Sequence, residues 1–251
     1  MSGGEQTSTE EQIRREQILR GWRAVRARIA AACADAGRDP AEVTLVAVSK
    51  TFPATDIRVA VALGINDLGE NRDQEARVKA AELADLDVRW HFVGRLQRNK
   101  AASVARYAAV VHSLDRPDLI DALARGADRA GRQVRALVQV SLDPVDLGAG
   151  TGRPGRGGAA PADVPALADR IAAAASLRFG GVMAVAPLGA DPVAAFAVLA
   201  DVSARLRANH PSAATISAGM SADLEAAIAS GATLVRVGTA VFGSRPPMLL
   251  G

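Results

Sequence analysis

The sequence predicts an α/β fold, a single (β/α)8 barrel of the TIM type with an extra N-terminal helix. Short apolar runs rich in β-branched residues alternate eight times with segments of helical periodicity. The chain has 251 residues and is 49% hydrophobic, which suits one large domain with a substantial core. An open doubly wound sheet is the alternative that the same alternation allows.

The expected strands cover residues 43–48, 65–69, 89–94, 109–114, 135–142, 177–184, 214–218 and 234–238. The expected helices lie between them, at residues 54–63, 72–83, 97–107, 117–130, 164–175, 192–209 and 222–230. Because the last strand is followed by only a short stretch of chain, we expect the first helix to cover that side of the barrel.

The N-terminal region predicts a tail and then a long helix. Residues 1–10 are polar and are expected to be disordered, which leaves 11–251 as the barrel domain. Apolar positions recur at helical spacing over residues 11–37, and Gly37 and Pro40 supply a stop. The arginines at positions 14, 15, 20, 23, 26 and 28 are interpreted as a solvated helix face rather than as a basic patch.

Composition limits the classes of partner. The net charge of +3 comes without a concentrated Lys/Arg tract, which favours small anionic ligands over nucleic acid. Aromatic residues make up 3% of the chain, too few for a base-stacking platform. The single Cys33 is interpreted as a small buried hydrophobe. Neither a membrane-spanning run nor the apolar core of a signal peptide is found, so we expect a soluble, cytoplasmic protein.

A lysine stands at the end of the first expected strand. Residues 45–53 read LVAVSKTFP, an apolar run that ends in Ser49 and Lys50 before Pro53 breaks the pattern. The carboxyl ends of parallel strands are where ligands collect in α/β folds. If Lys50 is partly desolvated there, it becomes a better amine nucleophile. The alternative is a lysine that extends into solvent.

The long irregular stretch 143–161 contains six glycines. Residues 150–155 read GTGRPG, which has the spacing of a dinucleotide-binding fingerprint, but they follow a loop and Pro154 interrupts the start of any helix. We interpret the stretch as a mobile lid or a disordered loop, whose Arg153 and Arg156 can approach an anionic ligand.

A second informative stretch is residues 216–225, ISAGMSADLE, where a short strand leads into a helical pattern. Hydroxyls of Ser217 and Ser221, the flexible Gly219 and helix N–H groups would form a phosphate cradle. Asp223 in the first helical turn would repel a dianion if it pointed inward. The alternative is that Ser221 is a plain N-cap without a ligand.

The third stretch is residues 233–243, TLVRVGTAVFG. Arg236 and its valine neighbours should point to opposite faces of the strand, so the arginine needs an acceptor or anionic partner. Gly238 and Thr239 let backbone and hydroxyl come close to a ligand, where barrels commonly hold phosphate. An internal ion pair for Arg236 is the alternative.

Together, the three stretches place an amine, a phosphate cradle and a cation at one barrel mouth. Pyridoxal 5′-phosphate (PLP) uses all three, because its aldehyde forms a Schiff base with a lysine, its phosphate takes N–H and hydroxyl donors, and its ring nitrogen takes a protein partner.

The same motifs give the chain a family resemblance. Over about residues 43–243 it resembles the pyridoxal phosphate homeostasis proteins, whose fold is similar to the barrel domain of alanine racemase. The matching pieces, in order, are AVSKT (47–51), GEN (69–71), HFVGRLQRNK (91–100), HSLDR (112–116), GVMA (181–184), SAGMSADLE (217–225) and VRVGTAVFG (235–243).

The resemblance implies roles for individual residues. Lys50 matches the lysine that forms the Schiff base, Arg236 the arginine that faces the pyridine nitrogen, and Asn71 and Met183 positions that line the ring. The phosphate positions match Ser217, Ser221, Gly238 and Thr239, with Gly219 in the same turn. The chain departs from the family pattern at residues 143–161, where a Lys-Ser-Gly element is common, and at Ala218, where Met is usual.

The function predicted in this way is that of a carrier, which holds PLP and passes it to PLP-dependent apo-enzymes in transient contacts. Racemases on the related fold use a Tyr base from a second domain, whereas the one tyrosine here, Tyr107, lies toward the end of an expected helix. The barrel domain lacks that second domain, so we expect a monomer.

Two other classes of function stay open. A racemase-like PLP enzyme would need a further acid or base, for which His91, His112 and Lys100 are candidates, although structural roles suit them too. A binding module without a cofactor would depend on the arginine-rich first helix alone. The spacing of histidines and of Cys33 does not predict a metal site.

Overall fold

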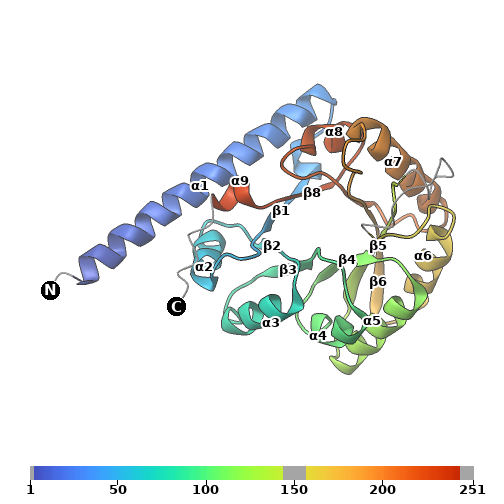
Figure 1. Ribbon diagram of the computed structural model, residues 1–251, viewed down its shortest axis with the longest axis horizontal. Helices are drawn as coiled ribbons and strands as arrows, with labels where there is room; N and C mark the ends of the chain where they lie inside the picture. Colours follow the sequence, from blue (N-terminus) through green and yellow to red (C-terminus); the bar gives the residue numbers. More distant parts are fainter. Residues whose placement is uncertain (1–2, 144–156, 244–251) are drawn as a thin grey trace.

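The computed structural model describes residues 3–143 and 157–243, and of residues 3–8 it describes the backbone only. Eight parallel strands form a closed barrel in the order β1 to β8, with β1 paired to β8. The (β/α)8 prediction is therefore confirmed, and the open sheet is excluded. Helices surround the strands as an outer layer (Figure 1).

The strands are β1 (Thr44–Val48), β2 (Asp67–Glu70), β3 (Arg89–Phe92), β4 (Val110–Leu114), β5 (Val134–Gln139), β6 (Leu177–Met183), β7 (Thr215–Ser217) and β8 (Leu234–Val237). The helices are α1 (Gly3–Asp35), α2 (Ala54–Ala62), α3 (Asp73–Glu82), α4 (Ala101–Val104), α5 (Pro117–Arg129), α6 (Val164–Ala172), α7 (Pro192–Asn209), α8 (Leu224–Ala229) and α9 (Thr239–Phe242). Two short 3₁₀ helices cover Pro40–Glu42 and Arg98–Lys100.

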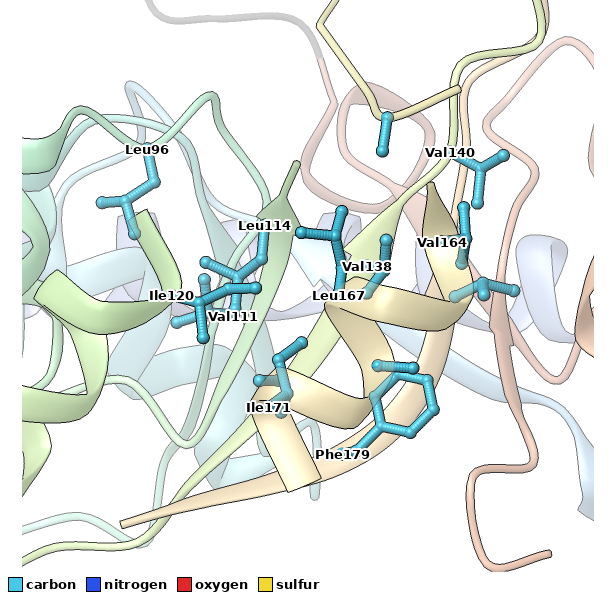
Figure 2. Packing of buried hydrophobic residues seen from close by; sticks show 14 of the residues in the cluster. Leu96, Val111, Leu114, Ile120, Val138, Val140, Val164, Leu167, Ile171 and Phe179 are labelled. Carbon is cyan, nitrogen blue, oxygen red and sulfur yellow. The ribbon is translucent and has the colours of Figure 1, made fainter. Parts of the chain in front are cut away.

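The core has an outer and an inner part, because successive side chains of a strand point to opposite faces. Between the strands and the helices lie two large clusters of buried apolar side chains. Figure 2 shows part of one of them, which includes Leu167 and Ile171 of α6 and Val138 of β5. The inner layer is much more polar: β3, β4 and β8 contribute His91, His112 and Arg236, all buried. This polar interior sets up the site described below.

Helix α1 closes the barrel beside its first and last strands. It packs on α8, α9 and α2, so it covers the side that we expected it to cover (Figure 1). Its arginines are only partly a solvated face, which corrects the sequence interpretation. The guanidinium of Arg14 donates to Asp56 and to the carbonyl oxygen of Phe242 at 2.8 Å, and Arg28 pairs with Glu225 at 2.8 Å. These contacts link α1 to elements that follow it by up to 228 residues.

Two segments differ from the prediction. Helix α1 begins at Gly3, inside the segment 1–10 that we expected to be disordered, because no Gly or Pro interrupts the chain between Glu5 and Gly21. The helix expected at 97–107 is instead the 3₁₀ turn Arg98–Lys100 followed by the single turn of α4, which begins at Ala101 and ends at Val104. Of the lid or disordered loop predicted at 143–161, residues 144–156 lie outside the described residues, whereas Ala159 in its described part forms a parallel bridge with Val140 and so is ordered.

Other sequence expectations concern the chain as a whole. Cys33 is fully buried among apolar side chains of α1 and its neighbours, which confirms its reading as a small hydrophobe. In the described ranges, each helix is too short or too polar to cross a bilayer.

We predict that Arg14→Ala lowers the free energy of unfolding by about 1 to 3 kcal/mol, because it leaves the buried carboxylate of Asp56 and a carbonyl oxygen without their donor. Urea unfolding measures this. The control is Arg58→Ala, which removes a fully exposed pair with Asp85 and should change stability very little. Equal losses for the two variants would show that α1 is not fixed by Arg14.

Candidate functional site

A cavity of about 340 Å³ opens at the carboxyl end of the barrel. Its walls come from the residues that follow six strands, in keeping with the usual position of ligand sites in this architecture. The lining residues are Val48, Lys50, Phe52, Asn71, Val93, Gly94, Val185, Met220, Ser221, Arg236, Gly238 and Thr239. Six of the nine predicted site residues are thus brought together: Lys50, Asn71, Ser221, Arg236, Gly238 and Thr239.

Lys50 follows β1 directly and its side chain is exposed, which favours the solvent-facing alternative over partial desolvation. The turn that carries it is strained, because Thr51 has a φ of 70°, a left-handed conformation that is unfavourable for a β-branched residue. The carboxylate of Glu75 on α3 accepts the backbone N–H of Thr51 at 2.5 Å. The strain is therefore held by a specific partner.

Glu75 belongs to a buried charge cluster beneath this turn. The ammonium group of Lys79 donates to Glu75 at 2.5 Å, to Glu70 at 2.7 Å and to the carbonyl oxygen of Ser49 at 2.9 Å. Burial raises the pKa of Glu70, while Lys79 and the Ser49 hydroxyl act against that rise. The residues on both sides of Lys50 are thus tied to α3 and β2, which fixes where the Lys50 side chain starts.

We predict that Lys79→Met destabilises the fold by about 3 to 5 kcal/mol, because it leaves the buried carboxylate of Glu70 without a cation. The double variant Lys79→Met with Glu70→Gln removes that charge and should recover much of the loss. Denaturant unfolding of both variants checks this. A double variant as unstable as the single one would contradict the role of the uncompensated charge.

The two late turns differ in detail from the predicted cradle. Helix α8 begins at Leu224 and is six residues long, so Ser221 lies in the preceding turn and is not an N-cap. Asp223 accepts the backbone N–H of Met220 at 2.6 Å, which directs its carboxylate back along the loop. Gly219 has a φ of 92°, and an added Cβ would contact the Ala227 side chain at 2.8 Å. The turn therefore requires glycine there, although Gly219 itself does not line the cavity.

Gly238 and Thr239 form the other turn, between β8 and the short α9. A Cβ on Gly238 would lie 3.0 Å from the carbonyl oxygen of Val48, so glycine allows the end of β8 to approach the end of β1. The side chain of Thr239 is exposed at the cavity wall. This turn therefore places the hydroxyl of Thr239 and the backbone of Gly238 at the cavity wall, as the sequence predicted.

Arg236 is a buried cation at the base of the cavity. One terminal nitrogen donates to the carbonyl oxygen of Ser217 at 2.8 Å and to its hydroxyl at 2.5 Å, and the other donates to the carbonyl oxygen of Ala184 at 3.0 Å. Burial lowers its pKa to about 10, so it stays charged at neutral pH. Among the described residues no carboxylate pairs with it, which excludes the internal ion pair in this part of the chain.

Ser217 and Met183 lie below the cavity rather than in its wall. Met183 packs inside the barrel against Val110 and Leu137. The fully buried hydroxyl of Ser217 contacts the Arg236 guanidinium and, at 2.9 Å, Nδ1 of His112. The hydroxyl that we expected at the phosphate is thus engaged by protein groups on both sides, because the period of two turns it into the barrel interior.

A chain of hydrogen bonds continues from Ser217 through the barrel. Nε2 of His112 lies 3.0 Å from Nδ1 of His91, and Nε2 of His91 lies 2.9 Å from Oδ1 of Asp67. Burial holds the pKa of His91 below its ordinary value and that of His112 well below it. Neither histidine, and neither Lys100 nor Tyr107, lines the cavity.

We predict that the free energy of unfolding falls as the pH drops below about 6.5. The unfolded chain then protonates imidazoles that the folded chain keeps neutral, which costs up to about 1.4 kcal/mol per pH unit for each such group. The variant His112→Gln should show a smaller slope between pH 5 and 7 in urea unfolding. An unchanged slope in His112→Gln would contradict the contribution of this buried imidazole. Because Glu70 contributes the opposite slope, the comparison between variants is the measurement that decides.

Six wall residues were not predicted: Val48, Phe52, Val93, Gly94, Val185 and Met220. All stand at or just after a strand end, which is the one signal that the sequence offers for them. Gly94 is required by packing, since a Cβ there would overlap the backbone of Asn71. That close approach ties the loop after β3 to the loop after β2 and so positions Asn71.

Comparison with known proteins shows the family to which this barrel belongs. The family model of the alanine racemase N-terminal domain matches residues 22–246. A pyridoxal phosphate homeostasis protein of Corynebacterium glutamicum is 42% identical over 229 residues, which cover 88% of this chain and 99% of that protein. The chain belongs to this family. Its relatives of the same name include one from Pseudomonas aeruginosa, 43% identical over 221 residues that cover 88% of this chain and 93% of that protein.

Solved structures agree with this family assignment. PipY of Synechococcus elongatus with PLP bound is 38% identical, has a TM-score of 0.72, and aligns over 86% of this chain and all of that chain. A protein of unknown function from Bifidobacterium adolescentis is 30% identical with a TM-score of 0.82, and the alignment covers 91% of this chain and 96% of that one. The family resemblance that the motifs predicted is confirmed.

Proposed function

We propose that the protein binds PLP in the cavity at the barrel mouth, holds it as a Schiff base on Lys50, and passes it on to PLP-dependent apo-enzymes. The observation that carries the proposal is that Lys50, Ser221, Arg236 and Thr239 line one cavity of suitable size. The PLP-bound structure of PipY and the names of the curated relatives support the same cofactor.

The lining residues fit the chemical groups of PLP. The exposed amine of Lys50 is accessible to the aldehyde, and their condensation releases one water. Arg236 is buried and charged, and among the described residues no carboxylate pairs with it. Its guanidinium can therefore be stabilised by donating to a further acceptor, such as the ring nitrogen of PLP. The hydroxyls of Ser221 and Thr239, with the backbone at Gly238, suit a phosphate.

The chemistry of the wall favours a carrier over a racemase-like enzyme. Apart from Lys50 and Arg236, the described residues that line the cavity have no ionisable side chain, so a second acid or base is not found among them. A charged guanidinium beside the ring nitrogen disfavours protonation of the ring and weakens its ability to accept electrons. Both features suit binding and release better than sustained turnover.

The remaining parts of the proposal concern where and with what the protein acts. The proposed protein is a cytoplasmic monomer that contacts apo-enzymes transiently. The absence of a concentrated Lys/Arg tract and of a membrane-spanning run argues against nucleic acid or membrane as partners. Size-exclusion chromatography with light scattering tests the oligomeric state.

We predict that the purified protein incubated with PLP absorbs visible light, and that borohydride fixes the cofactor on the peptide that contains Lys50. Peptide mapping by mass spectrometry measures this. Lys50→Ala should lose both the visible band and the label, whereas Lys100→Ala, whose side chain is exposed outside the cavity, should keep them. Label retained by Lys50→Ala after dialysis would contradict the site.

A transfer assay separates the carrier from the enzyme. Loaded protein mixed with a PLP-dependent apo-enzyme should restore that enzyme's activity, and incubation with single-enantiomer amino acids should leave their configuration unchanged. Sustained racemisation would contradict the carrier and support the racemase-like alternative.

A further inference from the structure

With both imidazoles neutral, as their burial and lowered pKa values indicate, the buried chain from Arg236 to Asp67 has one arrangement of protons. The carboxylate of Asp67 can only accept, so Nε2–H of His91 donates to it, and Nδ1 of His91 then accepts from Nε2–H of His112. Nδ1 of His112 in turn accepts from the Ser217 hydroxyl, whose oxygen accepts from the Arg236 guanidinium. Every hydrogen bond in the chain thus points from Arg236 to Asp67, and the proton of each imidazole is on Nε2.

The two ends of this chain lie at opposite ends of the barrel. Arg236 lines the cavity at the carboxyl end of the strands. Asp67 is the first residue of β2 and, with His91, lines a separate cavity of about 600 Å³ at the amino end. A group remote from the proposed PLP site is therefore connected to it by four directed hydrogen bonds of 2.5 to 3.0 Å.

The charged groups around the chain favour this polarity. Burial acts to raise the pKa of the Asp67 carboxyl group, but the hydrogen bond from His91 and the pairing with Arg89 on β3 at 3.0 Å lower it overall, so the group is anionic. Arg135 on β5 acts on both histidines and, like Arg236 on β8, disfavours a positive charge on His112. With cations on several sides, protonating an imidazole is unfavourable, so the chain stays neutral between its charged ends.

We propose that Asp67, His91 and His112 are positioning residues for the cofactor: by fixing the direction of the chain they hold the Ser217 hydroxyl as an acceptor and so orient the Arg236 guanidinium toward the ring nitrogen of PLP. This inference rests on the proposed function. It gives a role to two histidines that do not reach the cavity, and a role in the site to a residue at the far end of the barrel.

The direct test compares two variants of Asp67. Asp67→Asn keeps an acceptor for His91 and should bind PLP almost as the wild type does. Asp67→Leu removes the acceptor, releases the fixed proton arrangement, and should weaken PLP binding about fivefold, the effect of one net hydrogen bond. Asp67 lies at the edge of the barrel, and thermal unfolding checks that both of its variants are folded. The control is Arg58→Leu, which removes an exposed ion pair with Asp85 away from the chain and should leave PLP binding unchanged.

A ligand analogue distinguishes a lost orientation of the Arg236 guanidinium from general damage to the fold. In 1-deaza-PLP a carbon replaces the ring nitrogen, so the analogue has an aldehyde and a phosphate but no acceptor for Arg236. Its affinity should be the same for the wild type and Asp67→Leu. An equal loss of affinity for PLP and for 1-deaza-PLP would overturn the inference, since it would show a merely structural effect.

Nitrogen NMR of ¹⁵N-histidine protein tests the chain itself without any ligand. The wild type and Asp67→Asn should show His91 and His112 as neutral Nε2–H tautomers from pH 6 to 8, and Asp67→Leu should show mixed tautomers. A charged imidazole or the opposite tautomer in the wild type would overturn the inference. Wild-type protein that has this chain but does not bind PLP would instead contradict the proposed function.

Discussion

The candidate site depends on one constraint, that the guanidinium of Arg236 stays charged although it is buried inside the barrel. Arg236 lies on the inner face of β8, where desolvation disfavours its charge, and the described residues near it offer carbonyl and hydroxyl oxygens instead of a carboxylate. Those oxygens belong to Ser217 and Ala184, at the ends of neighbouring strands. The position of the cation thus depends on the closure of the sheet between β6, β7 and β8.

Local signals carried much of this architecture. Strands such as Thr44–Val48 and Leu234–Val237 are apolar runs of β-branched residues, and their patterns need no knowledge of the rest of the chain. The position of Lys50, directly after such a run, was enough to place an amine at the mouth. Gly238 and Thr239 were found for the same reason. Where the local signal was mixed, as at residues 97–107, the predicted helix was too long.

What the sequence did not reveal depends on contacts between distant strands. The bond between His112 and Ser217 joins residues 105 positions apart, and it exists only because the barrel brings the inner faces of β4 and β7 together. The alternation of side chains along a strand predicts that His112 and Ser217 both point into the barrel. It does not predict that the two side chains contact each other. In the same way, the arginines of α1 had the spacing of an exposed face, and only the position of Asp56 and Phe242 turned Arg14 toward the barrel.

The close packing of α1 on α9 has a consequence for how the chain folds. Gly21 of α1 packs so closely on α9 that a Cβ there would overlap the backbone of Val241, and Arg14 reaches the carbonyl of Phe242. On a ribosome, α1 is complete long before its partners α8 and α9 exist, so the side of α1 that packs on them is exposed while the first seven strands are synthesised. Contacts between residues so far apart in sequence carry a high entropic cost of loop closure. The barrel should therefore close late in folding, and the packing of α1 on α9 makes that closure cooperative.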